Sequence, residues 1–312
     1  MTMIDTPRQW IEQHAHPLAT FEPAAPLNDL APLGDLARNA NVVALGAATR
    51  DTHELSVLAH RMLRFLVEES GFRTVALEGD SAASSAINDY VVAGVGDPRA
   101  LMANARTFWR TQELLDVVKW LRRYNMRHPH DPVRVAQASD AVPPSYDLGD
   151  IERFMAEEVI RWHERTGEKI VYWGGMAHTA DGMSRTIPMS GQRIAHRNAG
   201  SYLRQRFGAG YISMGLMFDH GVGAQNYPTP PTDFIDSTLG DTALDAYLLN
   251  LAMISSARAQ PWLTEPAKSR LVGPGYDPAD DADQYLAGGS LAEWFDGVVH
   301  CRKVTGAHWL HQ

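Results

Sequence analysis

Residues 41–80 read NVVALGAATRDTHELSVLAHRMLRFLVEESGFRTVALEGD, and this stretch decides the fold of the chain. The apolar run Val42–Leu45 is short and closes on Gly46, as a fully buried parallel strand does. Apolar residues then recur at spacings of three and four, which predicts an amphipathic helix that ends at Gly71. Thr74–Leu77 is the next buried strand. The pattern predicts a β-α-β unit.

Polar side chains follow both strands of this unit. In a right-handed β-α-β unit the two strands point the same way, so their carboxyl ends lie at one edge of the sheet. Open α/β proteins bind ligands at that edge. We therefore expect a site built from the polar residues that follow the two strands, which are Thr49, Arg50, Asp51, His53, Glu54, Glu78 and Asp80.

Apolar strands alternate with helical patterns along the rest of the chain. Further strands are predicted at residues 133–136, 170–173, 211–217 and 298–300. This alternation predicts an α/β fold in which a central, mostly parallel β-sheet is flanked by helices on both faces. Residues 1–40 are rich in Pro and Ala and are predicted to form a packed N-terminal arm. Residues 41–312 are predicted to form a single α/β domain, since no loop within them has the character of a domain linker.

The bulk composition excludes several classes of protein. The 312 residues carry a formal net charge of −9, which argues against nucleic acid or an anionic membrane as the main partner. No apolar run approaches the roughly 20 residues that span a bilayer, and the first residues lack the pattern of a secretory signal. The single cysteine, Cys301, is expected in the core and is compatible with a reducing cytoplasm. We therefore expect a cytoplasmic protein that acts on a small molecule and is able to form a homodimer.

Two ionisable residues at strand ends are the main catalytic candidates. Glu78 follows the second strand, where partial desolvation would raise the pKa of its carboxyl group and suit it to acid/base work. Asp80 lies at the same strand end. For either acid the alternative is to cap the next helix or to pair with an arginine. His178 follows the strand at 170–173 and two glycines, so its imidazole is expected to face the same cleft.

The polar residues after the first strand have competing interpretations. Arg50 could clamp a carboxylate or stabilise an oxyanion. Its alternative is a salt bridge to Asp51, Glu54 or Glu78. Asp51 and Glu54 have the D-x-x-E spacing of a capping box at the start of the helix, and the cap is the better interpretation for both. His53 lies in the same turn and could face either way.

Metal, nucleotide and serine-esterase motifs are missing from the sequence. It contains no H-E-x-x-H, paired C-x-x-C, EF-hand or P-loop pattern, no G-x-G-x-x-G after the first strand and no G-x-S-x-G. We therefore predict no bound metal and no cofactor. A weaker alternative is a metalloenzyme assembled from His53, Glu78, His178 and His300. His220 and His300 each follow a strand and could enter the cleft.

These landmarks resemble the erythromycin esterase family. The likeness rests on segments in the family's order, which are LGAATRDTHEL (45–55), FLVEESGFRTVALEGD (65–80), FWRTQELLDVVKWLRRYN (108–125), RFMAEEVIRW (153–162), IVYWGGMAHTADG (170–182) and FDGVVHCRKVT (295–305). The resemblance implies an α/β fold with a helical excursion. It also implies metal-independent hydrolysis of a macrolide lactone, in which a histidine and glutamates in a deep cleft activate water.

The chain departs from the family's pattern at the catalytic positions. The first strand of the family runs into G-E-x-x-H-G, and its glutamate and histidine match Ala47 and Arg50 here. The arginine expected in the next helix matches Ala59, and the first histidine of W-A-H-N-x-H matches Gly175. The family residues that remain are Glu78, Asp80 and His178. We interpret these changes as rewired chemistry rather than as the decay of an inert scaffold.

The sequence therefore predicts an enzyme of secondary metabolism, in antibiotic biosynthesis or resistance. It would act on an ester, lactone or neighbouring C–O bond of a natural-product-like molecule by hydrolysis, elimination or cyclisation. Glu78 and His178 would transfer protons and Arg50 would bind or stabilise an anion. Contacts with the substrate are predicted for His53, Glu54, Asp80, Trp109, Arg110, His220 and His300. The alternative is a non-catalytic protein that binds or sequesters a ligand; macrolide hydrolysis of the founding type is disfavoured.

Overall fold

The computed structural model describes residues 6–79, 81–137, 144–189, 192–252, 260–273 and 275–310. Within these ranges the strands of the central sheet lie in the order β1 (His16–Pro17), β10 (Ala246–Asn250), β13 (Gly297–Val304), β8 (Tyr211–Val222), β2 (Val42–Ala47), β5 (Ile170–Gly175), β3 (Thr74–Leu77) and β4 (Arg134–Val135). From β13 to β4 all neighbours are parallel, whereas β10 and β1 are antiparallel additions at one side. The predicted fold class, an α/β protein with a mostly parallel sheet, is confirmed.

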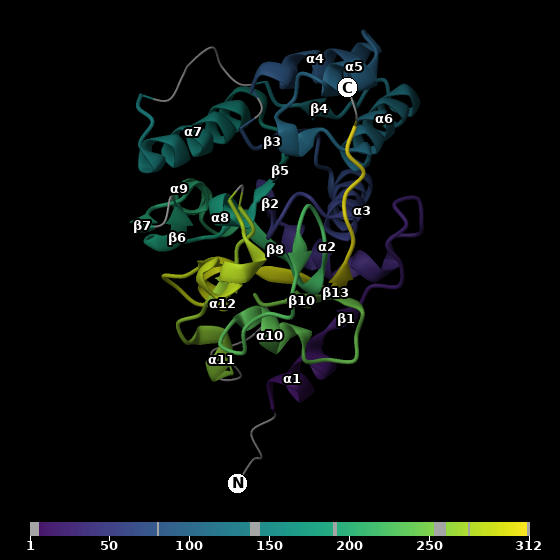
Figure 1. The fold of residues 1–312 in the computed structure, drawn as a ribbon. Coiled ribbons are helices and arrows are strands. Elements are labelled where there is room, and N and C mark those ends of the chain that lie inside the picture. The colour runs from purple at the N-terminus through teal and green to yellow at the C-terminus, as the bar shows by residue number, and fades with distance from the viewer. Residues whose placement is uncertain are drawn as a thin grey trace.

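Helices flank this sheet on both sides (Figure 1). The α-helices are α1 (Pro7–His14), α2 (Ala31–Ala37), α3 (His53–Ser70), α4 (Ser81–Ala93), α5 (Pro98–Met102), α6 (Gln112–Arg127), α7 (Leu148–Thr166), α8 (Met176–Thr179), α9 (Ala199–Phe207), α10 (Ile235–Gly240), α11 (Pro261–Thr264) and α12 (Leu291–Trp294). Short 3-10 helices lie at Asn28–Leu30, Thr107–Trp109, Gly208–Gly210 and Pro278–Asp283. The remaining strands are β6 (Arg185–Met189), β7 (Gln192–His196), β9 (Asn226–Tyr227), β11 (Ser269–Arg270) and β12 (Tyr285–Leu286). Of the helices in the described ranges, none has the length and apolarity needed to cross a membrane.

Alternate residues of the central strands face two separate helix layers. Val43 and Leu45 of β2 pack in the larger core, to which α2, α3 and α6 contribute. Val42 and Ala44 pack in a second core, to which α7 and α9 contribute. In Figure 1 these two groups of helices lie on opposite sides of the sheet. Because both faces are covered, every residue of β2 is buried, and its sequence reads as a continuous apolar run.

The predicted strands coincide with β2, β3, β4, β5, β8 and β13, and β8 continues five residues further, to Val222. The sequence did not predict β10. Apolar residues continue at Leu251 directly after Asn250, so the pattern gives this strand no clear end. The N-terminal segment pairs with this strand through β1 and places Trp10 and Ile11 in the larger core. The N-terminal segment therefore adds a strand to the sheet and two side chains to the larger core.

Gly46 allows the end of β2 to approach α8 closely. A Cβ atom on Gly46 would lie 2.8 Å from the Cα atom of Met176 and would also collide with Thr179 Oγ1. The Gly46→Ala substitution should therefore lower the free energy of unfolding by about 1–3 kcal/mol, the usual effect of overpacking. Urea unfolding followed by circular dichroism measures the change. Gly273→Ala is the matched control, since a Cβ atom there meets nothing within 4 Å. Equal stability of the two variants would contradict this close approach.

Candidate active site

The carboxylate of Glu78 is fixed at the end of β3. Its Oε2 atom accepts hydrogen bonds from Arg50 Nη1 and from the backbone N–H of Gly175, both at 2.6 Å. The indole N–H of Trp109 donates to the Glu78 carbonyl oxygen at 3.1 Å. Gly174 makes room for this arrangement, because a Cβ atom there would lie 2.6 Å from Oε2. Glu78 is therefore buried, with its carboxylate held by Arg50 and Gly175 and its backbone held by Trp109.

Opposing effects act on the pKa of Glu78. Burial raises this pKa, but the charges of Arg50 and His178 and the N–H of Gly175 together outweigh the burial and hold it below its usual value. The sequence-based expectation of a raised pKa is therefore wrong, because that expectation counted desolvation without the guanidinium. Glu78 is a carboxylate at neutral pH.

His178 faces Glu78 from α8, which follows β5. Its Nε2 atom lies 3.5 Å from Glu78 Oε1, and its Nδ1 atom lies 2.7 Å from Glu152 Oε1. Burial lowers the pKa of His178, but the two carboxylates, Glu152 first, more than offset the burial, and the pKa lies above its usual value. The raised pKa favours the protonated, positively charged imidazole, which lies between two acids with its Nε2 atom on the side of Glu78.

Glu152 of α7 is a site residue that the sequence reasoning missed. Its carboxylate is fully buried and contacts Arg185 in addition to His178. It also accepts a hydrogen bond from the Ala199 backbone N–H at 2.8 Å. The available signal was an acid on a buried helical stripe, whose members are Glu152, Ala156, Val159 and Trp162. Glu152 orients His178 and compensates its charge.

Arg50 lies on the other side of Glu78. Its guanidinium carbon is 3.9 Å from the centre of the Phe108 ring, a cation–π contact that holds the group in one orientation. Among the described residues, the hydrogen bonds of Arg50 use only Nη1, which leaves other N–H groups for a ligand. A Cβ atom on Gly175 would lie 3.3 Å from that same Nη1. Arg50 therefore occupies the space beside position 175.

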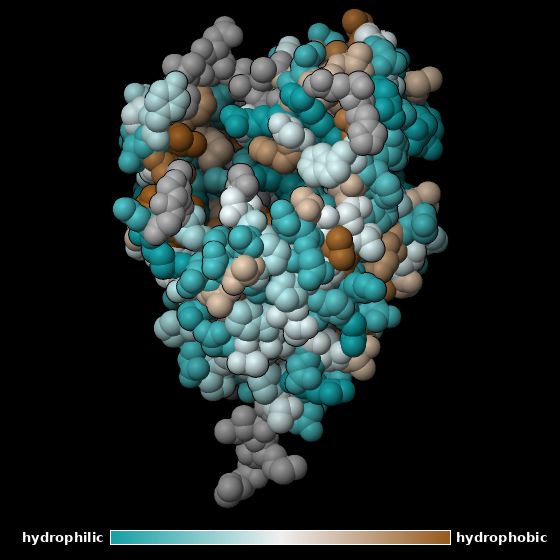
Figure 2. Space-filling model, viewed as in Figure 1, coloured by the Kyte–Doolittle hydropathy of each residue, from teal (hydrophilic) through white to brown (hydrophobic). Residues whose placement is uncertain are grey.

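The structure brings Arg50, Glu78 and His178 together, as predicted, at the carboxyl ends of β2, β3 and β5. Figure 2 shows that this face of the molecule is hollowed between α7 and α4, with hydrophilic and apolar surface around the hollow. Of the predicted substrate contacts, Asp80 lies outside the described residues. Trp109 is buried and supports Glu78, whereas Arg110 donates to the Ala105 carbonyl at 2.7 Å.

Asp51 and Glu54 do not form the predicted capping box. The N-cap residue of α3 is Thr52, and no side chain there makes a capping hydrogen bond. Asp51 instead accepts hydrogen bonds from the Tyr227 hydroxyl and the Ala224 N–H. The Glu54 carboxylate accepts from the N–H and hydroxyl of Thr305, at 2.6 and 2.8 Å. That prediction is wrong because partners distant in sequence take both acids.

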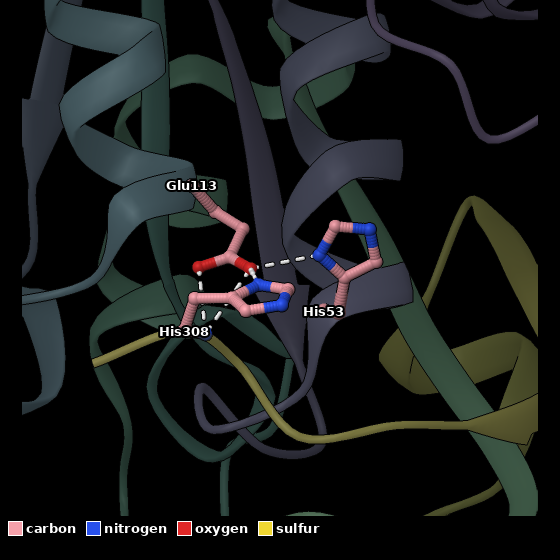
Figure 3. Close-up of side chains that lie close together, drawn as sticks. All are labelled: His53, Glu113 and His308. Carbon is pink, nitrogen blue, oxygen red and sulfur yellow. Dashed lines mark hydrogen bonds and ion pairs between the residues drawn. The ribbon is translucent and has the colours of Figure 1, made fainter.

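The remaining histidine predictions have different outcomes. His53 lies 2.7 Å from Glu113, in a group that also contains His308 (Figure 3). His300 is fully buried within β13 beside Tyr247 rather than at the end of a strand, and its contact with substrate stays a prediction. The metal group considered as a weaker alternative, His53 with Glu78, His178 and His300, is not assembled in the described part of the chain.

His220 and Cys301 have surroundings of their own, without a contact to Glu78 or His178 among the described residues. His220 contacts Asp219 at 2.7 Å near the far end of β8. Cys301 is buried in β13, where burial raises the pKa of the thiol to about 12. The expected core position of the cysteine is confirmed.

The fold and this site define an α/β protein in which a glutamate and a histidine face each other at the carboxyl edge of the sheet. The family model described as erythromycin esterase matches residues 67–136 and 144–304. The chain therefore belongs to the erythromycin esterase family.

Individual relatives agree with this assignment. Erythromycin esterase type II of Escherichia coli is 31% identical over 117 residues, which are 38% of this chain and 28% of that protein, so the match spans less than a third of the relative. The crystal structure of a Bacillus cereus protein matches 98% of both chains with a TM-score of 0.80 at 21% identity. A mutant of the erythromycin esterase EreC in its open conformation matches 94% of this chain and 98% of its own, with a TM-score of 0.68 at 12% identity. At these identities the two structures are similar in fold.

Removal of the Glu152 charge tests the support behind His178. The Glu152→Gln variant leaves His178 and Arg185 without their shared carboxylate, so the free energy of unfolding should fall by about 3–5 kcal/mol at neutral pH. The pKa of Glu152 lies well below its usual value, although burial alone would raise it. The stabilisation by Glu152 is therefore present above its usual pKa of 4.5 and is lost as the pH falls toward the lowered pKa. Denaturant titrations at neutral and acidic pH measure both effects.

The matched control for this variant is Glu157→Gln on the same helix. The Glu157 side chain is 40% exposed and pairs with Arg153 and Arg161 at the surface. The Glu157→Gln substitution should change the free energy of unfolding by less than about 1 kcal/mol. An equal and small effect of both substitutions would show that Glu152 has no special role.

Proposed function

We propose that this protein hydrolyses an ester or lactone bond in a small, natural-product-like molecule, with Glu78 as general base and His178 as general acid. The observation that carries the proposal is the opposition of Glu78 Oε1 and His178 Nε2 across 3.5 Å. Each group is held from behind, Glu78 by Arg50 and Gly175 and His178 by Glu152. Among the described residues, Oε1 accepts no hydrogen bond, which leaves its lone pairs for a water molecule.

In the proposed steps, every bond that breaks is matched by a bond that forms, and every proton has a stated acceptor. Glu78 takes a proton from water as the water oxygen attacks the carbonyl carbon. The C–O bond to the leaving alcohol then breaks, and His178 donates its Nε2 proton to the departing oxygen. Transfer of the proton from Glu78 to His178 restores the starting state. Positioned acids and bases of this kind contribute about 10²–10⁴-fold to a rate.

Arg50 would stabilise the negative charge that develops on the carbonyl oxygen. Its guanidinium stacks on Phe108, already oriented, so little reorganisation is needed when the charge appears. The same cation could instead bind a carboxylate of the substrate. Hydrolysis by the water-activating pair of the family pattern is disfavoured, because Ala47 and Arg50 stand at those positions.

The Glu78→Gln variant tests the proposed base. It keeps the shape of the side chain but cannot take a proton from water, so kcat/KM should fall by about 10²–10⁴-fold. The measurement uses a panel of aryl esters and lactones, with Glu157→Gln as a control that keeps full activity. Isotopically labelled water identifies the reaction, because hydrolysis puts the labelled oxygen into the acid product and elimination does not. Full activity of Glu78→Gln would contradict the assignment, and tight binding without product would support a sequestering protein.

The pH dependence of kcat/KM tests which group is the acid. The pKa of Glu78 is below its usual value of 4.5, so activity should persist in mild acid and fall as the pH drops through this lowered pKa. The pKa of His178 is above its usual value of 6.5, so activity should fall as the pH rises through this raised pKa. The expected profile is therefore a bell between the lowered pKa of Glu78 and the raised pKa of His178. A rate that increases through the alkaline range would reverse the roles and make neutral His178 the base.

A further inference from the structure

Two histidines and one glutamate meet where the last described segment of the chain crosses the start of α3. Figure 3 shows both imidazoles turned toward Glu113, His53 from α3 and His308 from the segment after β13. The Nδ1 atoms of both rings lie 2.7 Å from the same oxygen, Glu113 Oε1. One donor atom from each residue can be chosen so that all three lie within 4.8 Å of one another. The proposed hydrolysis uses none of these three side chains.

We propose that His53, Glu113 and His308 bind a divalent transition-metal ion of the zinc class. Two imidazole nitrogens and one carboxylate oxygen are a donor set that proteins use for zinc, with a water molecule at the fourth position. The His308 side chain is 69% exposed, so water can reach that position. The site is separate from Glu78 and His178 and differs from the metal group considered from the sequence.

The geometry requires only a small adjustment. Zinc bonds of about 2.0–2.2 Å in a tetrahedron place ligand atoms about 3.4 Å apart. The two contacts of 2.7 Å would therefore open by about 0.7 Å. His308 can supply one half of this movement, because its side chain is exposed and lies outside any helix or sheet strand. His53, whose side chain is 35% exposed, would supply the other half.

The protonation states also suit a metal. The Glu113 carboxylate faces both imidazoles and accepts hydrogen bonds from their Nδ1 atoms. Both Nδ1 atoms then carry the hydrogens that point at it. A metal ion would take the place of those two hydrogens, and each ring would carry its proton on Nε2 instead. The backbone N–H of His308 donates to both Glu113 oxygens at 3.2 Å and would keep the carboxylate in place.

The bound ion would tie three parts of the chain together. The segment after β13 runs beside α3 to the start of α6 (Figure 1). Backbone hydrogen bonds already join it to both helices, from Gln112 N–H to the His308 carbonyl at 2.7 Å and from His53 N–H to the Thr305 carbonyl at 2.8 Å. A metal would add a side-chain link to these backbone links and would hold the segment more firmly against α3 and α6.

Zinc titration of the protein tests the proposal. Protein purified without a histidine tag and dialysed against EDTA is titrated with zinc sulfate by isothermal calorimetry, and one ion per chain should bind. The His308→Ala variant should bind at least about tenfold more weakly, since even residues that only support a ligand cost 10–100-fold. This variant should fold, because the lost side chain is largely exposed. His130→Ala removes an exposed histidine outside the group and should keep the wild-type affinity.

A second measurement separates this site from nonspecific binding. Cobalt(II) in the site should give the visible absorption of a tetrahedral complex, and this absorption should disappear in Glu113→Gln and His308→Ala. Magnesium should not compete, because it prefers six oxygen ligands. Absence of zinc binding to the wild-type protein, or equal affinity of wild type and His308→Ala, would overturn the proposal. Neither result depends on ester hydrolysis, so the two proposals can fail separately.

Discussion

The ion pair between Arg50 and Glu78 is the interaction on which the rest of the site depends. A buried carboxylate without a partner costs several kcal/mol, so Glu78 can stay charged only because Arg50 and His178 face it. His178 in turn needs Glu152, and Glu152 also contacts Arg185. Charges therefore alternate in sign along the whole row. Loss of Glu78, His178 or Glu152 would leave a neighbouring charge without its partner. The elements that carry these residues therefore have to meet at this edge of the sheet.

The departures from the family's pattern are physically linked. A histidine at position 175 and an arginine at position 50 would compete for the same space, since a Cβ atom on Gly175 already approaches Arg50 Nη1 at 3.3 Å. Ala47 lines a cavity of about 10 Å³ with Arg50 and Trp109, which is room for about one water molecule where a longer side chain would extend. Random decay would leave unfilled space and unpaired charges. Here Arg50 occupies the space beside Gly175 and pairs with Glu78, which favours a rebuilt site.

The sequence predicted the part of the site that follows from strand order. Parallel strands with polar residues at their ends place Arg50, Glu78 and His178 at one edge, and no side-chain packing is needed to infer it. Glu152 comes from a helix whose rotation is set by packing, so the sequence pattern alone did not show that this acid faces the site. The capping box failed for a related reason, because Asp51 has partners near residue 225. The sequence pattern around Asp51 gives no information on partners so far away along the chain.

In the proposed mechanism, the cations Arg50 and His178 contribute more to the rate than the base Glu78 does. By holding the pKa of Glu78 low, Arg50 makes this carboxylate a weaker base, and each unit of pKa is about 1.4 kcal/mol of proton affinity. The same arrangement places two positive groups, Arg50 and His178, around the point where negative charge would develop. Preorganised charge in a buried site is usually the largest single contribution to catalysis. A chain with Ala47 and Arg50 at the family's water-activating positions would thus rely on stabilising the oxyanion, and its best substrates would be esters whose carbonyl carbon is already reactive toward water.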